Sequence, residues 1–438
     1  MCRGPDFHSE DRRVTAIVPP PSRHARRPSA ATYRRRRSVA IAAVLAFLLG
    51  ATYVPLVMFA SITPAGVTVD GPAPVVIDSA ELNWPSYGAA ALGVVELPDL
   101  LERRGTKTAR PMASITKLIT ALTVLEAHPL DRGAEGPEIS MTSADVAQYA
   151  RFVALNGKVL PVSAGQSFSQ RDLLEVVIIE SSNNHAASLA AWAFGSESEF
   201  LLAAKDFLAR NGLDSITVVD PAGIDDGNVG ATGDLVALGK LVLQNPVLTE
   251  IVGMKTTDVD YLGEIGSTNT LLGIDGVTGL KTGTLMGWGA NLLFSADIDV
   301  ADQQAVTVVG VVLGAPDHVR LAKDVRRLLA TARERIQAVT LASAGDEVGE
   351  YTTAWGETAA LVVAEDISWL AWGDQELIPT IDADALTTGA AGTELGTLVF
   401  RSADGSASLD APLELASGVD DPGFWWRMAH PGIIVGNP

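Results

Sequence analysis

Cysteine is almost absent from this sequence of 438 residues. The single cysteine, Cys2, excludes a disulfide framework and a cysteine-rich zinc site, and it lies too far from any apolar run to be a lipoprotein cysteine. No cluster of zinc ligands occurs, so we expect neither a metal nor another cofactor. Charged residues make up only 19% and apolar residues 47% of the chain, which excludes a disordered or fibrous protein. The length suits two or three domains.

Positive charge is scarce outside the N-terminus. Residues 1–37 contain ten arginines and three acidic residues, so this arm carries +7. The remaining 401 residues have 22 basic and 49 acidic side chains, which gives −27. Nucleic acid is therefore excluded as a partner of the body of the protein.

No charged residue occurs between Arg37 and Asp70. The apolar run 38–62 has 25 residues, enough to cross a hydrocarbon core of about 30 Å. Four arginines, residues 34–37, precede it, so the positive-inside rule predicts a cytoplasmic arm (1–37), a single transmembrane helix (38–62) in the cell membrane, and an extracytoplasmic remainder. The alternative is a signal peptide cleaved near residues 63–65.

The rest of the chain divides into a linker, two domains and a tail. Residues 63–85 are rich in proline, glycine and valine and predict an extended, unpacked extracytoplasmic linker. Residues 86–338 mix strand-like and helical runs, which predicts an α/β or α+β domain. Strands are expected at 89–96, 291–296 and 305–313, and helices at 115–127, 171–179, 200–211, 234–244 and 320–336.

Helical periodicity stops after Ala338, and short apolar runs separated by turns predict a small all-β domain at 339–420. These runs are 359–364, 367–372, 395–400 and 406–415, with a hairpin turn at 404–405. The tail 421–438 contains an aromatic run, Phe-Trp-Trp. We expect this run to pack against the β domain, with contact to the membrane interface as the alternative.

The first chemical motif is Ser114-Ile-Thr-Lys117, followed by a run with apolar residues at helical spacing. Ser114 is expected to open this helix. Residues three apart share a helix face, so Lys117 can reach the Ser114 hydroxyl and act as the base that a serine nucleophile needs. The alternative is an N-capping serine beside a solvated lysine.

The second motif is Ser181-Ser-Asn183, between two helical stretches. A hydroxyl with an amide two residues further can relay a proton and hold a peptide backbone. A polar turn between helices is the alternative, and we expect a structural role for the neighbouring His185.

The third motif is Lys281-Thr282-Gly283-Thr284, which enters a glycine-rich strand. A cation and two hydroxyls along a strand edge can bind a carboxylate, and Gly283 permits close approach of the backbone. A turn with a surface lysine is the alternative.

The combination is more specific than any one motif, because Ser181 follows Ser114 by 67 residues and Lys281 follows Ser181 by 100. Ser-x-x-Lys, Ser-x-Asn and Lys-Thr-Gly in this order resemble the signature of penicillin-recognising serine enzymes. The segments RPMASITKLITAL, LLEVVIIESSNNHAA and STNTLLGIDGVTGLKTGT resemble low-molecular-weight penicillin-binding proteins, the serine-type D-alanyl-D-alanine carboxypeptidases. The resemblance implies a β-lactamase/transpeptidase-like domain, with an antiparallel sheet and helices.

The resemblance also implies the reaction. The enzyme would remove the terminal D-alanine from peptidoglycan stem pentapeptides through an acyl-enzyme, and β-lactams would inhibit it covalently. Its site residues would be Ser114 as nucleophile, Lys117 as base and Ser181 as proton relay, with Asn183, Lys281, Thr282, Gly283 and Thr284 binding substrate and the backbone amides of Ser114 and Thr284 forming the oxyanion hole. Arg320 is a further candidate for the substrate carboxylate.

For Lys117 to act as a base near neutral pH, its pKa must lie well below its ordinary value of about 10.4. We expect burial and the positive charge of Lys281 to lower it.

Two other functions remain open. A class A β-lactamase shares the three motifs but needs a glutamate that activates water, and residues 217–226 contain none. A catalytically silent scaffold that binds the cell wall would keep the fold without turnover. Such a scaffold would not need intact motifs, so the presence of Ser114, Lys117, Ser181 and Lys281 argues against it.

Overall fold

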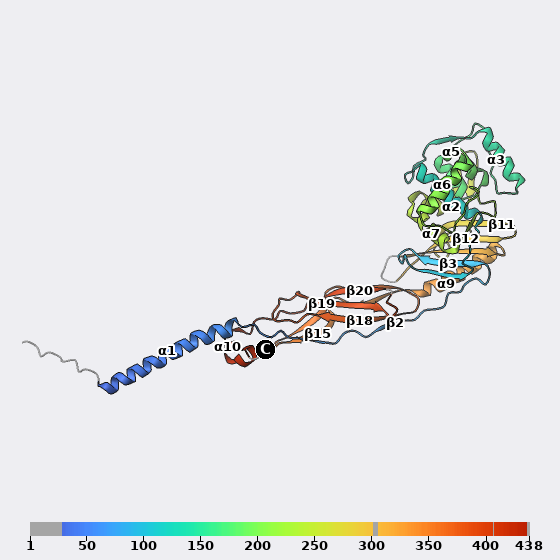
Figure 1. Cartoon of the computed structure of the whole chain (residues 1–438). Coiled ribbons are helices and arrows are strands. Elements are labelled where there is room, and N and C mark those ends of the chain that lie inside the picture. The colour runs from blue at the N-terminus through green and yellow to red at the C-terminus, as the bar shows by residue number, and fades with distance from the viewer. Residues whose placement is uncertain (1–28, 301–304, 406, 436–438) are drawn as a thin grey trace, which may run out of the picture.

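The computed structural model describes residues 29–300, 305–405 and 407–435. The first 28 residues of the basic arm, with Cys2, lie outside them. The apolar helix α1 (Ala30–Phe59) and the α/β domain lie at opposite ends of the molecule, with the β domain between them (Figure 1).

A five-stranded antiparallel sheet forms the centre of the α/β domain, in the order β11-β12-β13-β3-β4. The three strands that the sequence predicted here are confirmed. The strands are β3 (Ala89–Val94), β4 (Leu101–Gly105), β11 (Val277–Leu285), β12 (Gly289–Ile298) and β13 (Val306–Ala315). Most residues of β3, β12 and β13 are buried, because helices cover both faces of the sheet.

One large apolar core joins one sheet face to a group of helices, and a second core joins the other face to α9 (His318–Arg335). The first group contains α2 (Thr116–Ala127), α3 (Ser143–Ala154), α4 (Gln170–Ile178), α5 (Asn183–Phe194), α6 (Glu197–Arg210), α7 (Thr232–Gln244) and α8 (Pro246–Val252). All five helices expected from periodicity are present. Three short ribbons connect them: β5 (Arg110–Pro111) with β8 (Val229–Gly230), β6 (Glu138–Ser140) with β7 (Ser167–Ser169), and β9 (Thr256–Val259) with β10 (Gly263–Gly266).

Side-chain caps fix where several helices begin. Thr142 and Ser169 each form a capping box, at the starts of α3 and α4. Asp317 accepts from the backbone amide of Arg320 at 2.7 Å and begins α9.

The β domain has its own apolar core and a seven-stranded sheet in the order β1-β15-β16-β20-β19-β18-β2. Its strands are β15 (Glu347–Thr352), β16 (Thr358–Val363), β18 (Gln375–Ala383), β19 (Glu394–Ser402) and β20 (Ser408–Leu415). β14 (Ile336–Ala342) and β17 (Ile367–Trp372) form a separate antiparallel pair. The expected hairpin turn at 404–405 connects β19 and β20, which pair antiparallel.

The prediction of an unpacked linker at 63–85 is wrong for two segments. β1 (Val67–Val69) pairs with β15, and β2 (Val75–Ile77) pairs with β18. Both segments form edge strands, where backbone hydrogen bonds to the sheet outweigh the lack of a long apolar pattern. The linker is therefore part of the β domain sheet.

Helix α1 spans Ala30–Phe59, so it begins inside the basic arm and ends before residue 62. The Ser29 hydroxyl accepts from the Thr32 amide at 3.3 Å and caps its start. It is the one helix of the described residues that is long and apolar enough by itself to cross a membrane. At the other end of the chain, α10 (Gly423–Ala429) and α11 (Pro431–Val435) contact both α1 and each other.

Candidate active site

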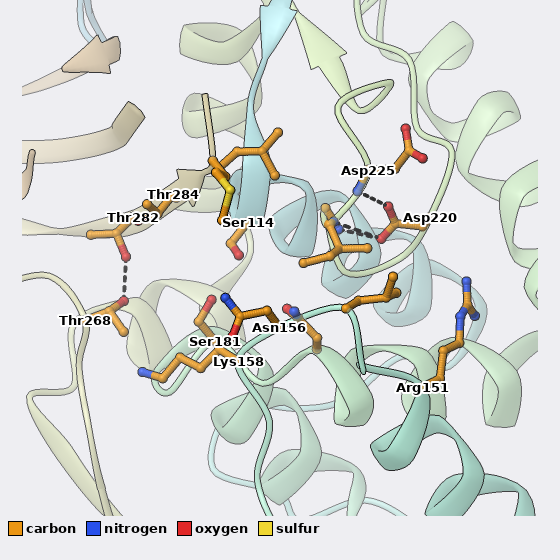
Figure 2. A pocket seen from close by; sticks show the side chains of 18 of the residues that line it. Ser114, Arg151, Asn156, Lys158, Ser181, Asp220, Asp225, Thr268, Thr282 and Thr284 are labelled. Atoms are coloured by element: carbon orange, nitrogen blue, oxygen red, sulfur yellow. Dashed lines mark hydrogen bonds between the residues drawn. The ribbon is translucent and has the colours of Figure 1, made fainter. Parts of the chain in front are cut away.

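Ser114 lies in a 3₁₀ turn, Ala113–Ile115, directly before α2, rather than in the first turn of the α-helix itself. Ala113 has a left-handed φ of 53°, which is unfavourable for a residue with a Cβ. The Thr116 hydroxyl donates to the Ala113 carbonyl at 2.7 Å and supports this turn. The turn places the Ser114 side chain in the wall of a cleft (Figure 2).

Lys117 is fully buried beneath Ser114. Its Nζ lies 3.0 Å from Ser114 Oγ, 2.6 Å from Asn183 Oδ1 and 2.6 Å from the Ala222 carbonyl oxygen. A neutral amine has two N–H groups and one lone pair. When Asn183 and Ala222 accept the two N–H groups, the lone pair is left for the Ser114 hydroxyl, so this geometry lets Lys117 take the serine proton.

The pKa of Lys117 is lowered to about 7, chiefly by burial. Asp220 opposes the shift, and the nearby Lys158 ammonium adds to it. Lys158 is thus a cation that assists burial at Lys117, and the repulsion between Lys117 and Lys281 that the sequence suggested is present as well, where it lowers the pKa of Lys281. Burial, Lys117 and Lys158 together lower the pKa of Lys281 well below its ordinary value.

Ser181 lies between α4 and α5 in the wall of the cleft, with a left-handed φ of 66° that is strained for a non-glycine residue. Backbone contacts fix it in place: the Ser182 amide donates to the Val176 carbonyl at 3.3 Å, and the Asn183 amide donates to the Lys158 carbonyl at 2.8 Å. In Figure 2 the Ser181 side chain lies in the same wall of the cleft as Lys158 and Asn156.

Asn183 has a position that the motif alone did not indicate. It is 4% exposed, and its Oδ1 accepts from Lys117, so it orients the amine as well as lining the cleft. His185 is buried against Phe168 and shares a 2.8 Å hydrogen bond with the Ser182 hydroxyl. Burial lowers the pKa of His185 to about 4, and it does not line the cleft. These contacts fit the structural role expected for His185.

The third motif lies on β11, across the cleft from Ser181. Gly283 is required by close packing, because a Cβ there would lie 2.9 Å from the Met112 carbonyl oxygen and 3.1 Å from the Ser114 amide nitrogen. This contact brings the β11 backbone, with the Thr284 amide, beside the Ser114 amide. The Lys281 side chain is buried, and its Nζ donates to the Thr282 carbonyl at 3.3 Å.

Four residues beyond the three motifs shape the cleft. Thr268 and Thr282 share a 2.6 Å hydroxyl–hydroxyl hydrogen bond, and Thr284 Oγ1 lies 2.6 Å from His318 Nε2. Lys158 forms a 2.8 Å ion pair with Glu180, at the edge of the cleft. These contacts join residues 14 to 34 positions apart in the sequence, a separation that no short motif covers.

Arg320 does not line the cleft. Its Nε forms a 2.6 Å ion pair with Asp324 on the same helix, four residues away, and the side chain is 46% exposed. His318 is the residue of this helix that reaches the cleft. The prediction of Arg320 as a carboxylate ligand is therefore not supported by its position.

The cleft has a volume of about 1640 Å³. It is lined by Ser114, Ser181, Asn183, Thr268, Thr282, Gly283, Thr284 and His318, and extends to Arg151 and Glu197. Lys281 lies under its wall. The structure thus brings the three motifs together around one cavity.

The acidic side chains of the cleft already have partners. Asp220 accepts from the amides of Ala222 and Gly223, both at 2.7 Å, and from the Asn228 side chain. Glu197 pairs with Arg151 at 3.0 Å. Hydrogen bonds therefore commit Asp220 to holding the loop whose Ala222 carbonyl orients Lys117, and no glutamate occurs in residues 217–226. Within the described ranges, no group of three or more metal-ligating side chains occurs.

Comparison with known proteins agrees with this geometry. The family profile for D-alanyl-D-alanine carboxypeptidases matches residues 99–317, half of the chain. The D-alanyl-D-alanine carboxypeptidase DacF of Bacillus subtilis (strain 168) is 25% identical over 328 residues, which cover 71% of this chain and 80% of the relative. The D-alanyl-D-alanine endopeptidase of Escherichia coli (strain K12) is 33% identical over 143 residues, 32% of this chain and 43% of that protein.

Solved structures share the fold. Penicillin binding protein 5 from Haemophilus influenzae superposes with a TM-score of 0.55 at 18% identity, over 79% of this chain and 100% of that chain. The D-alanyl-D-alanine carboxypeptidase DacD from Francisella tularensis gives 0.54 at 18% identity, over 79% and 96%. The fold, the matched profile and the convergent motifs lead to one assignment: this chain belongs to the D-alanyl-D-alanine carboxypeptidase family of serine peptidases.

Proposed function

We propose that this protein is a membrane-anchored carboxypeptidase that removes the C-terminal D-alanine from peptidoglycan stem pentapeptides, with Ser114 as its nucleophile. The observation that carries the proposal is the position of Lys117 Nζ, 3.0 Å from Ser114 Oγ with two acceptors for its N–H groups. A pKa of about 7 leaves a large fraction of this amine neutral near neutral pH.

In the first step, Ser114 Oγ forms a bond to the carbonyl carbon between the two D-alanines while its proton moves to Lys117 Nζ. The negative charge that develops on the carbonyl oxygen is stabilised by the backbone amides of Ser114 and Thr284. The scissile C–N bond then breaks, and Ser181 donates its proton to the departing amine of D-alanine while it regains one from Lys117 Nζ, so that both side chains return to their starting protonation states. Water hydrolyses the resulting ester and restores the serine.

The terminal carboxylate of the substrate binds at the β11 side of the cleft, where Thr282 and Thr284 present their hydroxyls. Thr268 and His318 orient these hydroxyls through the two 2.6 Å contacts. The buried amine of Lys281 lies beneath the same wall, where it adds a polar group close to the carboxylate site. Asn183 contacts the substrate backbone from the opposite side. The two walls therefore hold the substrate amide over Ser114.

Mass spectrometry of a stem pentapeptide incubated with the full-length protein tests this function. We expect the loss of one D-alanine and no further cleavage, with none in the Ser114→Ala variant. An unchanged pentapeptide would contradict the proposal.

The intact motifs also support covalent inhibition by β-lactams. A fluorescent penicillin should label the enzyme stably, whereas rapid release of the label would indicate a β-lactamase and no labelling would indicate a silent scaffold.

We also propose that α1 anchors the protein in the cell membrane with the catalytic domain outside. The arginines at 34–37 lie near the start of α1, and positive residues favour the cytoplasmic side. Protease added to intact cells should digest the domains after residue 62 and spare the N-terminal arm. A mature N-terminus near residue 66 in the native protein would contradict the anchor and favour a cleaved signal peptide.

A further inference from the structure

The C-terminal helices fold back onto the outer end of α1. The Tyr53 hydroxyl donates to the Met428 carbonyl at 3.0 Å, and Arg427 Nη1 donates to the carbonyls of Met58 at 3.3 Å and Ala60 at 3.0 Å. Val57 is the one buried residue of α1 among the described side chains, and it lies within this contact region. These contacts join segments separated by more than 360 residues.

Arg427 binds two sets of polar groups at once, a carboxylate and backbone carbonyls. It forms an ion pair with Asp421, and it satisfies carbonyls at the end of α1 that have no partner within the helix. Its side chain is only 10% exposed. The one strongly basic side chain of α10 and α11 therefore points into the protein, and the outward surface of these helices is left without a permanent positive charge.

The outward surface is aromatic and apolar. Trp425 is 82% exposed and Phe424 is 42% exposed, and their rings meet edge to face at 5.0 Å. Trp426, the next residue, faces inward, where it stacks on His430 and meets Trp355 of the β domain edge to face, with 5.9 Å between the ring centroids. The helix α10 thus has one side attached to the β domain and another that lacks a protein partner among the described residues.

The position of this aromatic surface relative to the bilayer follows from the length of the transmembrane part of α1. A hydrocarbon core of about 30 Å takes up about 20 helical residues. Counted from Ser38, the core ends near residue 57. The contacts of Tyr53, Met58 and Ala60 with α10 therefore fall at the outer boundary of the bilayer, the level at which tryptophan is enriched in membrane proteins.

We propose that α10, α11 and the outer end of α1 form a membrane-interface foot, in which Phe424 and Trp425 insert into the lipid headgroup region. The inference rests on the proposed membrane span, and lipid is the occupant because the surface is continuous with that span. The foot connects the bilayer to the β domain through Trp426 and Trp355, so it fixes how the β domain stands on the membrane. Figure 1 shows the catalytic domain at the far end of this support.

Spin-label accessibility tests the foot in the full-length protein. Cys2→Ser removes the only cysteine, and single cysteines can then be introduced and labelled in nanodiscs of phosphatidylethanolamine and phosphatidylglycerol. Leu45→Cys reports the span, and Val76→Cys, on an exposed position of β2, reports water. We expect the label at Trp425→Cys to collide with an aqueous nickel chelate several-fold less often than the label at Val76→Cys. Ile433→Cys repeats the measurement with both aromatic residues intact.

Three other results of this experiment would overturn the proposed foot. Equal nickel access at positions 425 and 76, with position 45 shielded, would mean that α1 spans the membrane but α10 does not touch it. Nickel access at position 45 would remove the span and the foot together, without affecting the proposed peptidase. A label at 425 shielded from both nickel and oxygen would indicate cover by protein, such as a second copy of the chain.

A second variant tests the contact with α1. Arg427→Gln should raise nickel access at Ile433→Cys, because α10 loses its bonds to the end of α1, while acylation by penicillin stays unchanged as a check of folding. Arg401→Gln, on β19, is the matched control and should leave the label shielded. Unchanged access in Arg427→Gln would show that Arg427 does not hold the foot in place.

Discussion

The cleft of the catalytic domain and the core of the β domain differ in the polar groups that they bury. No charged side chain is buried among the described residues of 339–420. The catalytic domain buries Lys117, Lys281, Asp220 and Asn183, and it holds Ser181 in a left-handed conformation. Buried charges and strained backbone reduce stability, so their concentration around one cavity indicates that this region is built for chemistry.

Lys117→Arg should break the chemistry of the cleft most completely. Arginine stays protonated at any accessible pH, so it cannot accept the Ser114 proton. We expect the rate of acylation by penicillin to fall by about 10² to 10⁴-fold, the usual contribution of a general base. Stopped-flow acylation measures this. Lys205→Arg, exposed on α6, is the control and should acylate normally. A near-normal rate in Lys117→Arg would assign the base to another group.

Phe400→Ala should destabilise the core of the β domain without changing the chemistry of the cleft. Phe400 is 1% exposed in the β domain core, and loss of a buried phenylalanine costs about 3–5 kcal/mol of unfolding free energy. Denaturant unfolding should show this loss, while acylation stays within about twofold because the cleft is distant. Ile378→Ala, at a site 43% exposed, should cost little. A matching loss of acylation in Phe400→Ala would mean that the β domain shapes the cleft.

Gly283→Ala tests how closely β11 must approach Ser114. The added methyl group would lie 2.9 Å from the Met112 carbonyl oxygen, and such overpacking costs about 1–3 kcal/mol. If that cost falls on the reacting geometry, acylation slows by about 5- to 150-fold. Gly66→Ala, where no atom lies within 4 Å of the new Cβ, should be neutral. Equal rates in both variants would show that the close approach is unimportant.

Lys158→Gln should have the smallest effect. Wild-type acylation should rise with pH through about 7, as Lys117 loses its proton. Without the Lys158 charge, protonated Lys117 is less disfavoured, so its pKa rises and this acid limb moves to higher pH by less than about one unit. Lys158→Arg keeps the charge and should keep the profile. An identical pH profile in Lys158→Gln would mean that the Lys158 charge does not contribute to the low pKa of Lys117.

The sequence predicted the main elements of the fold because their periodicity is regular. It also predicted that Ser114, Ser181 and Lys281 serve one site, since three weak motifs in one order are more specific than any one. It missed Lys158, which reaches the cleft from a loop without a motif. A residue of this kind is placed by tertiary contacts, which leave no local pattern in the sequence.

Two errors have the same origin. The linker strands β1 and β2 have only three residues each, too short for an alternating pattern, and pair with partners about 280 and 300 residues further along the chain. Arg320 lies on a helix that the sequence predicted, but its side chain pairs with Asp324 on the same helix and does not line the cleft. Neither long-range pairing nor side-chain direction can be read from local composition.

The central claim is that Ser114 is the acylated nucleophile. Mass spectrometry of the full-length protein after incubation with penicillin tests it most directly, by digestion and location of the modified residue. We predict one penicilloyl group, attached to the Ser114 hydroxyl, and no modification of a Ser114→Ala variant that unfolds with nearly the wild-type free energy. Modification of Ser181 or another residue in the wild-type protein, or continued acylation of the folded Ser114→Ala variant, would contradict the claim.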